Sequence, residues 1–108
     1  MAVNKELLKG STGTLILTLL SRKQMYGYEL IKELEIVSGG LFELREGTLY
    51  PILHSLESDG HVKSEWVGEE GTRQRKYYSI TKTGRGLLKE KRQEWTDFKT
   101  AIDKVVFG

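Results

Sequence analysis

The sequence predicts a mainly α-helical fold with one small β-hairpin (the α+β class), followed by a long C-terminal helix. Apolar residues recur at helical spacing in three stretches before residue 60. After Gly60 the spacing changes to the two-residue period of β-strands, and from residue 81 onward apolar residues recur every seven positions. A chain of 108 residues is long enough for a single hydrophobic core.

The first two helices are predicted from leucine-rich patterns near the N-terminus. Residues 5–21 place several apolar side chains roughly on one helical face: Leu8, Leu15, Ile16, Leu19 and Leu20. A second helix is expected to begin after the turn at residues 26–28 and to end at Gly39 and Gly40. Alternating residues at 41–44 then predict one short strand.

The third helix, predicted over residues 46–60, has the most informative pattern. Its apolar face is formed by Leu49, Ile52, Leu53 and Leu56. Because proline is tolerated near a helix start, Pro51 is expected in the first turn, with the helix beginning between Glu46 and Thr48. The opposite face carries small, uncharged residues: Gly47, Pro51, His54 and Ser58. Short polar side chains suit a helix that enters a DNA groove, although an ordinary core helix with a polar back would have the same pattern.

Two strands are predicted after the third helix, over residues 62–67 and 75–80, joined by a flexible loop. Arg73, Arg75 and Lys76 lie at the loop and at the start of the return strand. Arginine is well suited to forked contacts with phosphate, so this hairpin is a candidate for binding nucleic acid. The alternative is a hairpin whose charges only keep it soluble.

The last helix is expected to start at Thr81, a good N-terminal capping residue. A seven-residue repeat follows, with Lys91 at the one position where an apolar residue is missing: Leu88, Trp95, Phe98, Ile102 and Val105. This seam is too long for a small domain to cover, so we expect it to pair with a second copy of the chain. Packing against the first helix is the alternative, and both contacts are compatible.

The net charge of +2 is unevenly distributed. Residues 1–25 carry +3, residues 26–60 carry −5, residues 61–93 carry +5 and residues 94–108 carry −1. A nucleic acid would therefore be held electrostatically by the N-terminal residues and by the segment after Gly60, and not by the third helix itself.

Several classes of protein are disfavoured by the composition. The sequence has no run of 18 apolar residues that would span a membrane, and the absence of cysteine suits a cytoplasmic protein. The two histidines, His54 and His61, cannot by themselves form a zinc site. Glycine-rich phosphate loops and nucleophile elbows are missing, so we expect neither an enzyme nor a resident metal or cofactor.

The order of elements is that of a winged helix-turn-helix domain over residues 1–80, followed by a dimerisation helix over residues 81–108. Five motifs, in register over nearly the whole chain, also resemble the PadR family of bacterial transcriptional regulators: Gly13-Thr-Leu-Ile-Leu, Tyr26-Gly-Tyr-Glu-Leu, Glu46-Gly-Thr-Leu-Tyr-Pro-Ile-Leu, Leu56-Glu-x-Asp-Gly and Arg75-Lys-Tyr-Tyr-x-Ile-Thr. The single C-terminal helix is similar to that of the short subfamily.

The resemblance implies a homodimeric repressor that binds a near-palindromic operator in double-stranded DNA and is released by a small molecule. The DNA contacts of the family map onto residues in three helices and the wing: Lys5, Lys9, Ser11, Tyr26, Tyr28, Thr48, Tyr50, Pro51, His54, Arg73, Arg75 and Lys76. Among these, Tyr50 and His54 are the expected base-edge contacts.

The resemblance also implies an effector role for Trp95, because some short members hold planar aromatic molecules beside the corresponding tryptophan. Burial of Trp95 at a closed dimer interface is the alternative. A different class of function also remains open, in which the winged helix docks a polypeptide and does not bind specific DNA. The acidic balance of residues 26–60 supports that alternative, whereas the basic wing opposes it.

Overall fold

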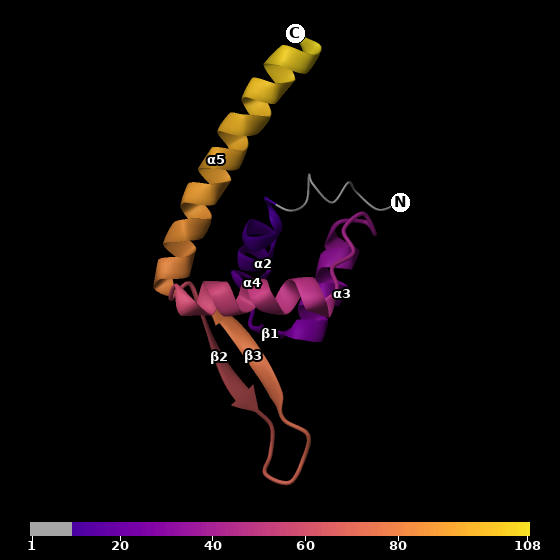
Figure 1. Cartoon of the computed structure of the whole chain (residues 1–108), viewed down its shortest axis with the longest axis vertical. Helices are drawn as coiled ribbons and strands as arrows, with labels where there is room; N and C mark the ends of the chain where they lie inside the picture. The colour runs from indigo at the N-terminus through magenta and orange to yellow at the C-terminus, as the bar shows by residue number, and fades with distance from the viewer. Residues whose placement is uncertain (1–9) are drawn as a thin grey trace.

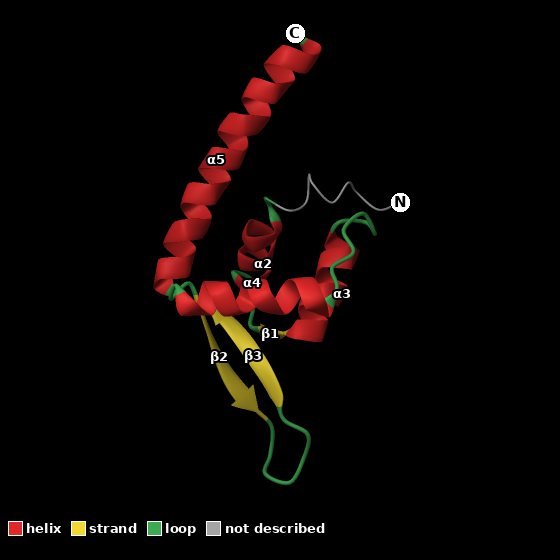
Figure 2. Ribbon diagram, in the orientation of Figure 1, coloured by secondary structure: helices red, strands yellow, loops and turns green. Residues whose placement is uncertain are grey.

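The structure is a computed structural model that describes residues 10–108 (Figure 1). Its elements follow one another as α2 (Thr12–Leu20), β1 (Met25–Tyr26), α3 (Gly27–Val37), α4 (Glu46–Ser58), β2 (Val62–Val67), β3 (Arg75–Ile80) and α5 (Lys82–Phe107). Figure 2 shows the helices gathered above a small sheet, with α5 extending away from them. The predicted fold class is therefore confirmed.

The sheet is antiparallel and has the strand order β1-β3-β2. Strands β2 and β3 form the predicted hairpin, in which Val62 is opposite Ile80 and Val67 is opposite Arg75. Strand β1 was not predicted, since a turn was expected at residues 26–28. A two-residue strand has no sequence period, and it exists here because it pairs with Tyr78 and Tyr77 of β3.

The hydrophobic core lies between α2, α3, α4 and the inner end of the hairpin. Leu49 and Leu53 of α4 are fully buried, and Tyr78 of β3 and Met25 of β1 are nearly so. Leu88 of α5 also belongs to this core, with 3% of its surface exposed. The prediction that Leu88 takes part in the dimer seam is therefore wrong, because the chain itself leaves this side chain almost no surface for a partner.

Helix α4 begins at Glu46, as predicted, but Pro51 is its sixth residue and lies in the second turn. The expectation that Pro51 occupies the first turn is therefore wrong. Proline removes the amide that would bond to the carbonyl of Gly47, and both residues are exposed, so water can satisfy that carbonyl. After α4 ends, Gly60 has the predicted left-handed conformation with φ of 80°.

Residues 41–45 form no strand, contrary to prediction. Leu44 is buried and Phe42 packs against the core, so their alternation with exposed neighbours marks an extended loop lying on the domain. The amide of Phe42 donates to the Ser38 hydroxyl and not to a neighbouring strand. Alternation in the sequence predicts a strand but cannot supply the neighbouring strand with which it would pair.

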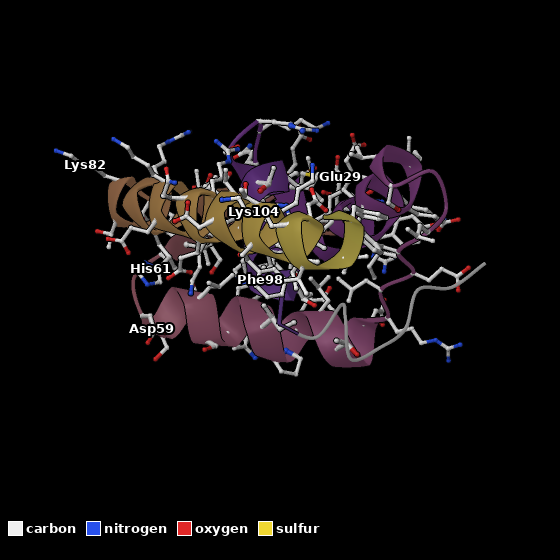
Figure 3. The ribbon with its side chains drawn as sticks, turned by 90° about the horizontal axis from the view of Figure 1, so that it is seen from above. Glu29, Asp59, His61, Lys82, Phe98 and Lys104 are labelled. Atoms are coloured by element: carbon white, nitrogen blue, oxygen red, sulfur yellow. The ribbon has the colours of Figure 1, made fainter. Side chains whose placement is uncertain are left out.

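Helix α5 starts next to the end of α4 and then leaves the domain. Thr81 caps α5 as predicted, accepting a bond from the amide of Gly84 at 3.0 Å, and its hydroxyl also donates to the carbonyl of Gly60. Figure 3 shows Asp59 and His61 close to this start of α5. Every residue from 89 onward is exposed in the single chain, and the molecule is accordingly elongated, with extents of 60 × 32 × 21 Å.

Candidate nucleic-acid interface

The face of α4 opposite the core is exposed and carries no charge in its central part. The predicted set lies together there: Gly47, Thr48, Pro51, His54, Ser55 and Ser58 are all exposed. Behind them the buried leucines anchor the helix, so the face is presented by a rigid element. Thr48, Pro51 and His54 therefore lie on one exposed face, and their contact with a DNA groove stays a prediction.

Tyr50 is oriented differently from these three residues. It is half-buried, and its hydroxyl approaches the start of α3 so closely that a β-carbon at Gly27 would overlap it. Its position on the flank of α4 makes it a packing residue between α3 and α4. The base-edge contact of Tyr50 stays a prediction, while His54, whose ring centroid is 6.4 Å away, lies on the exposed face.

Tyr26 lies in a cluster that joins β1 to the hairpin. The guanidinium of Arg75 lies 4.5 Å from the centroid of the Tyr26 ring, and the ring of Tyr77 meets Tyr26 edge-on at 5.4 Å. A cation over an aromatic face is attracted by the ring quadrupole, so Tyr26 orients Arg75. Tyr77 was not among the site residues predicted from the sequence, although it belongs to the motif Arg75-Lys-Tyr-Tyr.

The remaining predicted contacts lie toward the N-terminus of the chain. Tyr28 is 54% exposed in the first turn of α3, with Lys32 stacked over its ring at 5.4 Å. Ser11 is half-buried at the start of α2. Lys5 and Lys9 lie outside the described residues, as does the first part of the helix predicted over residues 5–21.

The hairpin carries its cations without carboxylate partners. Arg73 and Arg75 are exposed, and the ammonium of Lys76 lies over the ring of Tyr78 at 5.7 Å. Within residues 10–108 the ion pairs are Lys23 with Glu29 and Lys91 with Glu94, so the three hairpin cations are not neutralised by the chain. Unpaired cations beside a neutral helix face suit a partner that carries phosphates.

A polar cluster fixes the hairpin against α4. The Ser64 hydroxyl of β2 donates to the carboxylate of Glu57 in α4. Tyr78 is buried beside them, and burial, reinforced by the negative charge of Glu57 and by Tyr50, raises the pKa of its phenol above 10.0. The phenol is therefore protonated at neutral pH, and its negative form is excluded from this site.

The far part of α5 exposes the rest of the predicted seam. Trp95, Phe98, Ile102 and Val105 are between 44% and 84% exposed, and the Trp95 and Phe98 rings lie 6.0 Å apart. Figure 3 shows Phe98 on the side of α5 toward α4. Trp95 and Phe98 also line a groove of about 1120 Å³ between α2 and α5, together with Leu15 and Phe42.

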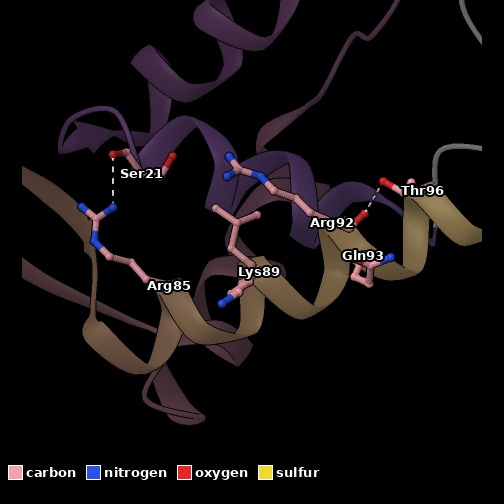
Figure 4. A pocket seen from close by; sticks show the side chains of 7 residues that line it. Ser21, Arg85, Lys89, Arg92, Gln93 and Thr96 are labelled. Atoms are coloured by element: carbon pink, nitrogen blue, oxygen red, sulfur yellow. Dashed lines mark hydrogen bonds between the residues drawn. The ribbon is translucent and has the colours of Figure 1, made fainter.

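A second, smaller cavity of about 370 Å³ lies where α5 crosses the end of α2 (Figure 4). Arg85, Lys89 and Arg92 border it, and the Arg85 guanidinium donates to the carbonyl of Ser21 at 3.5 Å. Within the described part of the chain, no cluster of histidine and carboxylate side chains is suited to hold a metal ion. None of the helices in residues 10–108 has the length and apolar character needed to cross a membrane.

A helix with an exposed neutral face, preceded by a second helix and followed by a basic hairpin, defines a winged helix-turn-helix protein. The sequence comparison is more specific: the family model of PadR-like transcriptional regulators matches residues 16–90. The chain belongs to this family. The predicted resemblance is thereby confirmed.

Solved structures support the same assignment. A transcriptional regulator from Clostridium thermocellum is 40% identical and superposes with a TM-score of 0.87, covering 94% of this chain and 98% of that one. A PadR-like transcriptional regulator from Bacillus cereus is 29% identical with a TM-score of 0.82, covering 95% and 98% of the two chains. A protein of Lysinibacillus sphaericus is 31% identical over 98% of this chain and 97% of its own length.

Proposed function

We propose that this regulator is a repressor that binds a near-palindromic operator as a homodimer in the cytoplasm. The observation that carries the proposal is the exposed, uncharged face of α4 beside the unpaired cations of the hairpin. A duplex groove accepts a neutral helix face, and the adjacent phosphates attract the cations. A polypeptide-docking face would be apolar or acidic, and the exposed centre of α4 is neither.

Each side chain has a distinct role in this proposal. His54, Thr48 and Pro51 meet base edges or the groove floor, because they occupy the exposed face of α4. Arg73, Arg75 and Lys76 contact phosphates flanking the groove, and Tyr26 orients Arg75. Further contacts with the DNA backbone come from Tyr28 of α3, from Ser11 before α2, and from Lys5 and Lys9 in the N-terminal sequence.

The exposed stripe of α5 pairs with a second copy of the chain. Trp95, Phe98, Ile102 and Val105 form a continuous apolar surface on the part of α5 that leaves the domain. Leaving four large apolar side chains in water is unfavourable, and an isologous pairing buries both stripes at once. Such a dimer also supplies the two α4 helices that a near-palindromic operator requires.

The effector is a planar aromatic molecule that stacks on Trp95. This part of the proposal is supported by the 55% exposure of the indole and by the large groove that Trp95 lines.

A planar cationic dye should quench the fluorescence of Trp95 in a Trp66→Phe background and lower operator affinity. Trp95→Ala should abolish both effects and keep the dimer. If the interface closes instead, the same change should cost about 3–5 kcal/mol of stability and the dye should have no effect.

Salt dependence provides the test of DNA binding. Binding to a duplex selected from a random pool should weaken steeply with salt, because each phosphate contact contributes about 0.9 to the slope of log affinity against log salt. Arg73→Ala combined with Arg75→Ala should flatten the slope and lower affinity for selected and random duplexes alike. An unchanged slope would exclude phosphate contacts by these two residues. Absence of duplex binding at low salt would overturn the proposed function.

A further inference from the structure

Trp66 is a large aromatic residue to which neither the core nor the proposed contacts give a role. It lies on β2, near the outer end of the hairpin, and is 64% exposed. None of the ring contacts within residues 10–108 involves its indole. An exposed tryptophan near the charged outer end of a hairpin indicates a surface that is covered when the protein is bound to something else.

The register of the hairpin determines which way Trp66 faces. Trp66 is opposite Lys76, and the next pair inward on the same face is Ser64 with Tyr78. Ser64 is hydrogen-bonded to Glu57 of α4, and Tyr78 is buried. This face is therefore the one that packs against α4, and Trp66 with Lys76 continues it beyond the last contact with the domain.

The opposite face of the hairpin contacts Tyr26 of β1. There Arg75 and Tyr77 meet Tyr26. Val67 follows Trp66 in β2 and therefore lies on this opposite face. It is 41% exposed and pairs with Arg75. The two faces thus present different chemistry: a tryptophan paired in register with a lysine on the α4 side, and a guanidinium held by a phenol ring on the other.

From this geometry we propose that Trp66 and Lys76 together bind the sugar–phosphate edge of the duplex next to the groove that receives α4. The edge of a DNA strand presents apolar deoxyribose faces alternating with anionic phosphates. An indole covers the sugar, and the neighbouring ammonium, which no carboxylate of the described chain neutralises, meets the phosphate. This inference rests on the proposed function and assigns to Trp66 a contact that is not ionic.

Charge at the hairpin tip supports a contact made by the stem. Glu69 and Glu70 precede Gly71 in the loop, whereas Arg73, Arg75 and Lys76 follow it, so these cations are concentrated where the return strand begins, and phosphates are attracted to that part of the hairpin. On the stem face that carries Trp66 and Lys76, the carboxylate of Glu57 lies at the inner end, where it accepts a hydrogen bond from the Ser64 hydroxyl, and the outer pair is formed by Trp66 and Lys76. The duplex edge is therefore expected along the stem, between the tip and α4.

The two tryptophans of the chain make the test direct, because each can be studied alone. In a Trp95→Phe variant, Trp66 is the sole indole. Adding the selected duplex should shift its emission to shorter wavelength and protect it from acrylamide quenching. In a Trp66→Phe variant, the remaining Trp95 should show neither change. Duplex binding is followed separately through the anisotropy of a dye on the DNA, so it does not depend on either indole.

Affinity measurements separate the indole from the ammonium. Trp66→Ala should weaken binding by about tenfold per wing, from the apolar area left uncovered, and should leave the salt slope unchanged. Lys76→Met should instead lower the slope by about 0.9 per wing. Val67→Ala is the matched control, since it removes an exposed apolar side chain from the opposite face, and it should have little effect on affinity.

The outcomes distinguish this inference from the proposed function. If the duplex binds by anisotropy while the emission and quenching of Trp66 stay unchanged, the inference is wrong and the proposed function stands. In that case the indole is free to meet a protein partner. Equal losses from Trp66→Ala and Val67→Ala would also overturn it. If no duplex binds, both proposals fail together.

Discussion

The two ends of the molecule differ in how their functional side chains are held. At the hairpin end, side chains are positioned by the chain itself: Arg75 is stacked on Tyr26, and Ser64 is bonded to Glu57. At the far end of α5, every side chain from residue 89 onward is exposed. The first region is complete in one chain, whereas the second leaves large apolar residues exposed, and we propose that a second copy of the chain covers them.

Helix α5 is divided between the core of the domain and an exposed apolar stripe. Leu88, near the start of α5, completes the core of the domain, while Trp95 and the residues after it extend past that core. Because a helix is rigid, its buried first turns determine where the exposed stripe points. A change in how two chains pair along the stripe would therefore move the domains, and with them the two α4 faces.

The largest effect is expected from charge in the exposed stripe. Phe98→Asp with Ile102→Asp should raise the dissociation constant of the dimer more than 100-fold, since burying an unpaired charge costs about 3–5 kcal/mol. Sedimentation at micromolar concentration measures this change. Secondary structure by circular dichroism should remain, because both side chains are exposed in the single chain. A double variant that is still dimeric would show that this stripe is not the seam.

A smaller effect is expected on the α4 face. His54→Ala should reduce discrimination between the selected duplex and one with altered half-sites by about 1–3 kcal/mol, the range for one good base contact. Competition binding at fixed salt gives this ratio. Ser58→Ala, on the same exposed face but near the end of α4, is the control. Equal losses on specific and random duplexes would make His54 a backbone contact.

The smallest effect is expected from replacing Tyr26, whose ring lies against the guanidinium of Arg75. Tyr26→Leu should weaken duplex binding by about 0.5–1 kcal/mol, the value of one exposed cation–π contact, because Arg75 loses the ring that orients it. Tyr26→Phe keeps the ring and removes only the hydroxyl, so it should bind almost as the parent does. If the phenylalanine variant loses as much as the leucine variant, the Tyr26 hydroxyl itself contacts the DNA.

The sequence by itself determined the elements that have a period of their own. Helices α3 and α4, the hairpin strands and the capped start of α5 were all predicted, because apolar spacing, glycine and a capping hydroxyl act over a few neighbouring residues. The neutral face of α4 followed from the same spacing. Family membership was also predicted, since its motifs are read directly from the residues.

Tertiary structure decided the features that require contacts between residues distant in the sequence. Strand β1 exists only because Met25 and Tyr26 meet β3, and residues 41–45 lack a strand because no neighbour pairs with them. The seven-residue spacing predicted Leu88 in the dimer seam, but the core of its own chain buries this side chain. The orientation of Tyr50 toward Gly27 likewise depends on how two helices pack, and a periodic pattern in one helix cannot report the position of another.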